Sequence, residues 1–171
     1  MRSSRARTLT AAFVTGIVAV VAMAGPAFAA NRERGLRNKQ YSPADLSTGV
    51  PGSSSEAWLR NTSLMEVFTI EDKGTYDRQP QVKFQNGWGY CLDSRGNHSS
   101  QSAWWVACNS GDYQLWQIFT NSNGTKTYKN KGAWTNQSRN LCLSTTGVNR
   151  AVIMQFCQLT TGPQQWTEIA P

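Results

Sequence analysis

Residues 90–118 read YCLDSRGNHSSQSAWWVACNSGDYQLWQI, and this stretch determines the fold. Its pattern recurs over residues 141–169, which read LCLSTTGVNRAVIMQFCQLTTGPQQWTEI. Each copy begins with Cys-Leu, continues through an apolar run that ends in a second cysteine, and closes on Gln-x-Trp. The first cysteine lies 25 residues before the tryptophan in one copy and 24 in the other, and the second lies 8 and 9 residues before it. Recurrence at a nearly constant period predicts a repeat architecture.

A third, degenerate copy without cysteines precedes these two. Residues 65–70, MEVFTI, align with the closing YQLWQI of the middle copy, and AWL at 57–59 aligns with AWW at 103–105. Ordinary strand sequence would fit residues 65–70 as well, and this alternative stays open. If the copy is real, three aromatic residues are equivalent and are spaced by 48 and 50 residues: Phe68, Trp116 and Trp166.

The pattern of short apolar runs predicts an all-β fold. Residues rich in Gly, Asn, Ser and Thr separate these runs, and no helical period is sustained over 12 residues beyond the N-terminal segment. Three copies of about four strands each cannot bury their apolar faces separately, so we expect a closed barrel with pseudo-threefold symmetry. The predicted strands that follow residue 80 are 82–85, 90–93, 103–108, 115–119, 127–129, 141–144, 151–156 and 166–169.

The N-terminal residues have the composition of a cleaved secretion signal. Three arginines within the first seven residues precede an apolar stretch over 11–24, and residues 27–29, Ala-Phe-Ala, fit the rule of small residues at a cleavage site. The apolar stretch is about 14 residues long, shorter than the roughly 20 that cross a bilayer. We therefore assign residues 1–29 to a signal peptide and expect a secreted protein with no membrane span.

The rest of the chain is expected to form one domain. Residues 30–41 are basic and have little to bury, so we predict a disordered tail there and the folded domain over 42–171. Without the signal's three arginines the chain has 14 basic and 10 acidic residues, and its net charge falls from +7 to +4. Four of these basic residues lie in the tail, so we expect no nucleic-acid partner. The tail is either simply solvated or touches a polyanion or membrane surface.

The even cysteine count of an exported chain predicts two disulfides. Three pairings are possible, and the local one, 91–108 with 142–157, closes two short loops of similar length. Each bond of that kind stabilises a fold by about 3 kcal/mol in the loop-entropy model. No Cys-x-x-Cys motif occurs and His98 is the only histidine, so we expect no metal and no cofactor. The residues concerned are Cys91, Cys108, Cys142 and Cys157.

These motifs resemble those of the ricin-B lectin family, which also occurs as carbohydrate-binding modules on secreted hydrolases. The resemblance rests on Cys91-Leu92-Asp93, the two cysteine spacings and the two Gln-x-Trp triplets; it is strong over 83–171 and weak over 42–82. It implies a β-trefoil, disulfides within each repeat, and a shallow sugar pocket in each competent repeat. A first repeat without cysteines is also similar to the trefoil cell-binding subunits of some bacterial toxins.

In that family, a pocket uses the aspartate after the first cysteine, an aromatic residue two before the second, and an Asn-Gln pair opening Gln-x-Trp. The carboxylate accepts hydrogen bonds from vicinal hydroxyls, the ring packs against the apolar sugar face, and the amides fix orientation. The middle repeat retains Asp93 and Gln114, whereas Val106 replaces the aromatic residue and Tyr113 the asparagine. The resemblance therefore implies an altered pocket in this repeat.

The adjacent tryptophans of the middle repeat can replace the missing ring. Neighbours on a strand face opposite ways, so one is expected in the core and the other is a candidate binding aromatic. The last repeat has Ser144, Gln155 and Pro163 at the pocket positions, and the first repeat has none of the set, so we expect no site in either. At most one family-type sugar site remains, with these candidates: Asp93, Gln114, Trp104, Trp105 and Tyr113.

Several candidates have a structural interpretation as well. Asp93 can bond the backbone of the turn that follows it instead of a ligand. Trp88 and Trp134 lie in Gly-rich segments and either mark a contact surface or pack across the fold. The two Gln-x-Trp triplets are expected to be structural, with their tryptophans in the core: Gln114, Trp116, Gln164 and Trp166.

The sequence offers no catalytic arrangement. His98 lies in a polar loop without an orienting carboxylate, and no phosphate-binding motif occurs. We therefore predict a non-enzymatic, secreted, lectin-like module that binds a glycan or polysaccharide. The alternative is a trefoil with decayed sugar sites that contacts a secreted protein, as a toxin accessory or cell-binding subunit or as an inhibitor.

Overall fold

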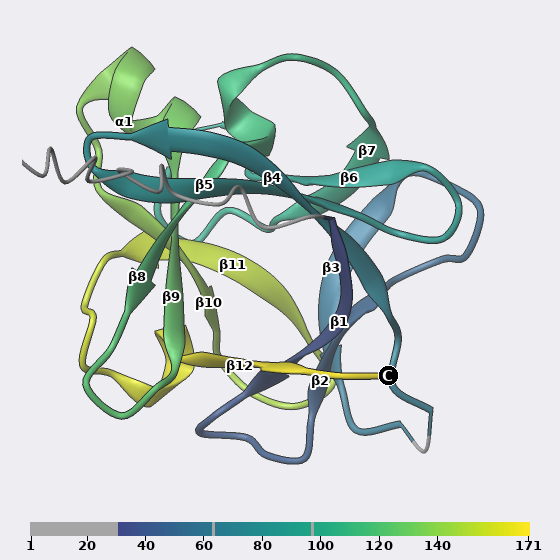
Figure 1. Ribbon diagram of the computed structural model, residues 1–171. Helices are drawn as coiled ribbons and strands as arrows, with labels where there is room; N and C mark the ends of the chain where they lie inside the picture. Colours follow the sequence, from purple (N-terminus) through teal and green to yellow (C-terminus); the bar gives the residue numbers. More distant parts are fainter. Residues whose placement is uncertain (1–30, 63, 97) are drawn as a thin grey trace, which may run out of the picture.

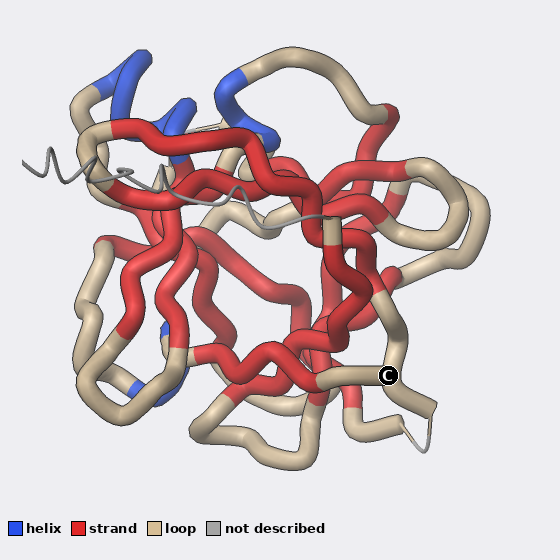
Figure 2. The backbone as a smooth tube through the Cα atoms, viewed as in Figure 1, coloured by secondary structure: helices blue, strands red, loops and turns tan. Residues whose placement is uncertain are grey.

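The computed structural model describes residues 31–62, 64–96 and 98–171, so the predicted signal peptide lies outside the described residues. Strands dominate this part of the chain (Figures 1 and 2). Besides them it contains one short helix, α1 (Lys131–Gln137), and two 3-10 turns, at Asp112–Gln114 and Gly162–Gln164. No helix among the described residues has the length and apolar character needed to cross a membrane. The strands are β1 (Arg32–Asn38), β2 (Asp45–Thr48), β3 (Ser55–Arg60), β4 (Phe68–Tyr76), β5 (Gln79–Gln85), β6 (Tyr90–Asp93), β7 (Trp104–Ala107), β8 (Trp116–Thr120), β9 (Lys126–Asn130), β10 (Leu141–Thr145), β11 (Arg150–Phe156) and β12 (Trp166–Ile169).

Six strands close a barrel. Antiparallel pairs run in a ring from β1 to β4, β5, β8, β9 and β12, and β12 pairs back with β1. Figure 2 shows these strands winding around one common centre. Closure leaves none of the six as a free edge, so their backbone groups are paired on both sides.

The other six strands form three hairpins that cover one end of the barrel. They are β2–β3, β6–β7 and β10–β11, and they contact each other through β3–β7, β3–β11 and a bridge between Ser102 and Ile153. Each third of the chain thus supplies four strands, of which the first and fourth enter the barrel and the second and third form a hairpin. This arrangement is a β-trefoil and confirms the predicted fold class.

The hairpin registers confirm that the first repeat is real. Leu46 lies opposite Leu59, Leu92 opposite Trp105, and Leu143 opposite Met154, and all six side chains are buried. Trp58, Trp104 and Ile153 follow as equivalent positions on the outward faces of the three hairpins, which is the alignment expected from AWL and AWW. The aromatic residues predicted in the core have no exposed surface: Phe68, Trp116 and Trp166.

The core tryptophans also satisfy their polar atoms in equivalent ways. Trp116 Nε1 donates to the Leu92 carbonyl at 3.0 Å, and Trp166 Nε1 donates to the Leu143 carbonyl at 3.1 Å. Each bond joins the barrel to the hairpin of the same repeat, so burial of a large ring leaves no unpaired donor.

The eight strands predicted after residue 80 are all present, with ends shifted by a few residues. Both disulfides, Cys91–Cys108 and Cys142–Cys157, are formed within their own repeats, as the family resemblance implied. Trp134 lies in helix α1, where the side chain of Asn130 caps the first turn, and not in a Gly-rich turn.

The predicted disordered tail is wrong for residues 32–38, because these form β1. This strand pairs with β12, β4 and β2 and buries Leu36 and Asn38. Two of its arginines form ion pairs: Arg32 with Glu168 at 3.0 Å and Arg37 with Asp45 at 2.8 Å. The folded domain therefore begins ten residues earlier than residue 42, at Arg32.

Candidate functional site

Trp104 and Trp105 point to opposite sides of β7, as neighbours on a strand must. Trp105 has no exposed surface; its ring stacks on Phe68 with centroids 4.9 Å apart, and its Nε1 donates to the Ser47 carbonyl at 3.3 Å. Trp104 lies half-buried on the outward face. Trp105 is therefore a core residue, which corrects its prediction as a sugar ligand, and Trp104 is the ring available to a ligand.

The outward face of β3 lies beside Trp104. Glu56 pairs directly with Trp104, and Ala57 N donates to the Ala103 carbonyl, so Trp58 is the diagonal neighbour of Trp104 on this face. Trp58 is also half-buried. These side chains line a groove with a volume of ≈ 520 Å³, together with Arg60 and residues of the loop between β2 and β3. The groove thus joins the first repeat to the middle one.

A guanidinium covers one face of each indole. The Arg60 Cζ lies 5.5 Å from the Trp58 ring centroid, and the Arg95 Cζ lies 4.9 Å from that of Trp104. Arg95 comes from the loop after β6, on the side of β7 away from β3, and does not line the groove. Its stacking therefore holds the Trp104 ring from behind and leaves the groove side open.

Asp93 supports this stacking contact. It lies opposite Trp104 on β6 and is nearly buried, and its Oδ1 accepts the N–H of Arg95 at 2.6 Å. Arg95 has a φ of 55°, in the left-handed region, and its carbonyl accepts a hydrogen bond from Gln101 Nε2 at 2.9 Å. Of the two interpretations of Asp93, these contacts support the turn residue. Asp93 thus acts on Trp104 through Arg95.

Gln114 lies inside the protein and not at the groove. It has no exposed surface; its Oε1 accepts the N–H of Asn109 at 2.8 Å and its Nε2 donates to the Ala107 carbonyl at 3.0 Å. Gln164 makes the same two bonds on either side of Cys157. Both glutamines clamp the chain around the second cysteine of their repeat, which is the structural interpretation, so Gln114 offers no group to a sugar.

Tyr113 also lies away from the groove. Its ring packs against Gly132 of α1 so closely that no β-carbon fits there, and its carbonyl accepts a hydrogen bond from Asn130 Nδ2 at 2.7 Å. On the same helix, Trp134 is half-buried beneath Lys129, whose Nζ lies 4.3 Å from the ring centroid. Of the five predicted sugar-binding residues, the structure therefore brings only Asp93 and Trp104 together.

The groove contains one group of each charge. The Glu56 carboxylate makes no hydrogen bond or ion pair within the described part of the chain, whereas Arg60 Nη2 donates to the Gly49 carbonyl at 3.3 Å. Across residues 31–62, 64–96 and 98–171 there is no cluster of three or more His, Cys, Asp or Glu that could hold a metal ion. The arrangement offers two aromatic faces, a free acceptor and a cationic donor, which is chemistry for binding.

A smaller hollow of ≈ 320 Å³ lies between Ser99 and Ser100 of the middle repeat and the third repeat. Gln155 lines it and accepts a hydrogen bond from the buried Ser144 hydroxyl at 2.7 Å, and Phe156 beside it is 58% exposed. Ile153 occupies the position of Trp58 and Trp104. The structure therefore gives this repeat no equivalent of the aromatic pair, and the expectation of no sugar site there stays a prediction.

Sequence reasoning missed three of the groove residues: Glu56, Trp58 and Arg60. They alternate along β3 with buried residues, a pattern typical of a strand with one face outward. The match of AWL with AWW was the available signal, since it made Trp58 the counterpart of Trp104. The match alone did not make Trp58 a candidate binding residue, because the first repeat lacks the family's pocket residues.

No protein-family model matches this sequence, and no curated protein matches it. The fold is similar to that of several solved structures. A designed threefold-symmetric protein, ThreeFoil, has a TM-score of 0.66 at 15% identity, covering 81% of this chain and 99% of its own. A Polyporus squamosus lectin, solved with the epitope Neu5Acα2-6Galβ1-4GlcNAc, has a TM-score of 0.66 at 17% identity. The match covers 82% of this chain and 49% of the lectin chain. A mosquitocidal holotoxin has a TM-score of 0.67 at 16% identity, and the match covers 82% of this chain and 17% of the toxin chain. The chain thus spans about half of the lectin and a smaller part of the toxin, and these likenesses show the β-trefoil fold.

Proposed function

We propose that this protein is a secreted, lectin-like module that binds a glycan in the groove between β3 and β7. One observation carries the proposal: two half-buried tryptophans from paired strands line the same groove as a free carboxylate and a guanidinium. Indole faces pack against the apolar C–H faces of sugar rings, while Glu56 accepts and Arg60 donates hydrogen bonds to hydroxyls. The groove volume lies within the roughly 300–1,000 Å³ usual for ligand sites.

The site differs from the one the family resemblance implied. It lies between the first and middle repeats, with Trp58 and Trp104 as platforms and Asp93 as a supporting residue behind Trp104. The glycan bound by the lectin neighbour and the two disulfides of this chain support, respectively, a sugar ligand and an extracellular location. Because the groove is open and its one carboxylate, Glu56, has no partner among the described residues to hold it in place, we expect weak affinity for a single sugar.

A glycan array probed with the secreted, oxidised protein tests this function. Trp58→Ala and Trp104→Ala should each weaken binding to the best glycan by at least about tenfold, because central tryptophans dominate binding energy. Trp134→Ala is the matched control, since it removes a half-buried tryptophan far along the chain and outside the groove. Absence of binding to any glycan at high protein concentration would contradict the proposed function. Unchanged glycan binding by both groove variants would show that the glycan binds outside this groove.

A second function, contact with a secreted protein, is favoured by the apolar surface of the third repeat. Phe156, which lines the hollow, is 58% exposed, and Leu159, three residues further along the chain, is 41% exposed. Solvent-facing apolar side chains that lie together mark protein contacts. If a secreted toxin component encoded beside this protein co-elutes with it, and Phe156→Ser abolishes the co-elution, this function holds. Co-elution that survives the substitution would exclude this surface.

A further inference from the structure

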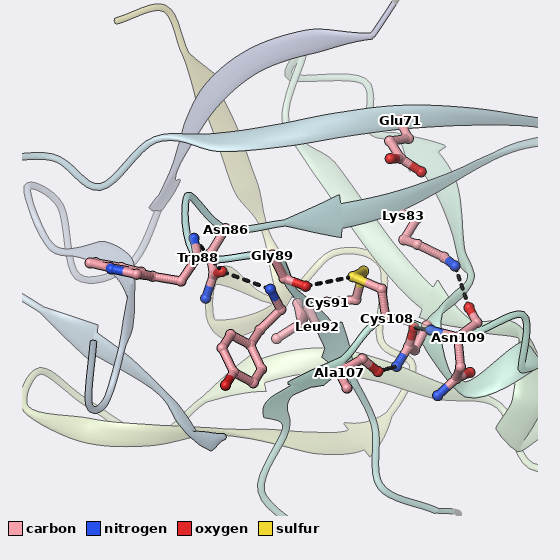
Figure 3. Close-up of a disulfide and its surroundings, with 12 residues drawn as sticks. Glu71, Lys83, Asn86, Trp88, Gly89, Cys91, Leu92, Ala107, Cys108 and Asn109 are labelled. Carbon is pink, nitrogen blue, oxygen red and sulfur yellow. Dashed lines mark hydrogen bonds between the residues drawn. A yellow bond between two sulfur atoms is a disulfide. The ribbon is translucent and has the colours of Figure 1, made fainter. Parts of the chain in front are cut away.

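A third tryptophan stands beside the groove in an unusual setting. Trp88 lies on the turn between β5 and β6, flanked by two glycines, and is 50% exposed. The Asn86 side chain holds this turn, because its Oδ1 accepts the N–H groups of Trp88 at 3.1 Å and of Tyr90 at 3.0 Å. Figure 3 shows the Trp88 indole extending away from Asn86 and from the Cys91–Cys108 disulfide. A large apolar ring is thus held toward solvent by a specific set of hydrogen bonds.

The loop between β2 and β3 connects Trp88 to the groove. A β-carbon at Gly52 would lie 3.8 Å from Trp88 Cδ1, and the Gly52 carbonyl accepts a hydrogen bond from Tyr90 Oη at 3.4 Å. Two residues earlier, Val50 is 57% exposed and lines the groove itself. The N–H of Val50 donates to Ser55 Oγ at 3.1 Å, which anchors this loop to β3. The loop therefore places Val50 in the groove lining and Gly52 against Trp88, so Trp88 stands next to the groove.

We infer that the groove takes an extended, neutral polysaccharide chain and that Trp88 is an additional subsite for its sugar rings. This inference rests on the proposed glycan function. The aromatic platforms are separate rings with hydroxyl and charged groups between them, which suits a ligand of alternating apolar faces and hydroxyls. A protein-contact site is instead marked by a large contiguous exposed apolar patch.

Charge favours a neutral chain. The lining holds one carboxylate, Glu56, and one guanidinium, Arg60, and the latter is already engaged with an indole and a backbone carbonyl. An acidic polysaccharide would bring repeated carboxylates close to Glu56, which has no cation bound to it among the described residues. A neutral sugar meets no such repulsion and can donate its hydroxyls to Glu56.

The test measures affinity against chain length by calorimetry. The neutral probes are cello-, xylo- and chito-oligosaccharides of one to six residues, together with the oligosaccharide series of the neutral sugar that binds best on the array. The acidic probes are oligogalacturonides of equal length. Affinity for the preferred neutral series should rise by about tenfold or more with length. Trp88→Ala should remove much of that rise and leave the mono- and disaccharide affinities unchanged. Trp134→Ala is the control, and near-ultraviolet circular dichroism confirms that each variant is folded.

The outcomes separate this inference from the function beneath it. If no glycan binds to the wild-type protein, both fall. If short sugars bind and Trp104→Ala abolishes their binding, but affinity is independent of length, the function stands and the extended site is wrong. Tighter binding of oligogalacturonides than of the neutral series would overturn the neutral class. Retention of the whole length effect in Trp88→Ala would overturn the assignment of Trp88 as a subsite.

Discussion

A single peptide unit separates a core residue from a groove-lining one in the Trp104–Trp105 pair. Both residues are tryptophans in the same strand, and the alternation of β7 alone decides their surroundings. Trp105 stacks on Phe68 of the first repeat, whereas Trp104 stands between the groove and Arg95. Identical side chains therefore have different surroundings: Trp105 is packed in the core, and Trp104 lines the groove of the proposed glycan site.

We predict that Trp105→Ala lowers the free energy of unfolding by about 3–5 kcal/mol, because it leaves a cavity in a packed core. Trp104→Ala should lower it by no more than about 1 kcal/mol, as expected of a partly exposed side chain. Urea denaturation of both variants measures the difference. Equal losses would contradict the assignment of the two rings.

At the level of the strand, β1 shows how charge can conceal an element of the core. Its alternating basic residues suggest a solvated segment, yet Leu36 is buried and Arg32 reaches Glu168 on β12. The Glu168 carboxylate also contacts Lys126 Nζ at 2.7 Å and accepts the Tyr128 hydroxyl at 2.9 Å. This cluster ties the first strand of the barrel to the last two, so β1 is part of the closed ring.

We predict that a chain beginning at residue 42 does not fold cooperatively. Its loss of β1 would leave β4 and β12 as unpaired barrel edges and open the apolar centre to water. A chain beginning at residue 30 is the control and should unfold in one transition, followed by circular dichroism during heating. Similar melting temperatures for the two chains would show that β1 is dispensable.

The Glu168 cluster predicts an acid-sensitive contribution to stability. Burial raises the pKa of this carboxyl, but the hydrogen bonds and charges of Arg32 and Lys126 outweigh burial and bring it to about 2. Since the folded-state pKa lies below the unfolded value, the contribution is complete above about pH 4.5 and is lost as pH falls toward 2. Its size is roughly 3 kcal/mol, from 1.36 kcal/mol for each pKa unit.

Urea unfolding at several pH values between 6 and about 2.5 checks this. The wild type should lose stability over that window, and Glu168→Gln should lose clearly less because the titrating group is gone. Glu33→Gln, at an exposed position on β1, is the matched control and should follow the wild type. Parallel curves for wild type and Glu168→Gln would contradict the role of this carboxylate.

For the molecule as a whole, the three repeats share one core but differ in their crosslinks, because only two of them contain a disulfide. The middle and last repeats each contain a disulfide, with sequence separations of 17 and 15 residues, and the first has none. In the first repeat, Glu66 replaces the clamping glutamine. Its carboxylate accepts hydrogen bonds from the backbone N–H and the hydroxyl of Thr48, both at 2.7 Å. The groove lies between this uncrosslinked repeat and the crosslinked middle one.

Replacing either cystine by two serines should lower the free energy of unfolding by about 3 kcal/mol. The two replacements should differ in binding, because Cys91–Cys108 spans the β6–β7 hairpin that presents Trp104, whereas Cys142–Cys157 lies in the last repeat. We expect weaker glycan binding only when the first bond is removed. Equal effects of both replacements on affinity would show that the hairpin does not depend on its disulfide for its shape.

Local patterns in the amino-acid sequence were enough for the repeat, the strands after residue 80 and the aromatic core. Each of these depends on residues close together in the chain, so alternation and spacing reveal them. The cystine pairing follows from the family resemblance, since cysteine spacing alone leaves three choices. The Gln-x-Trp glutamines were placed correctly by their structural interpretation.

The groove and the closing strand were decided by the folded chain. Trp58 lies beside Trp104 only because β3 pairs with β7 across the interface of two repeats. Arg32 donates a hydrogen bond to Glu168, which lies 136 residues further along the chain. Neither neighbour is visible in local spacing. Periodicity reports which way a side chain points, but what it points toward depends on long-range strand pairing, and that pairing turns a basic segment into a barrel strand and two separate tryptophans into one site.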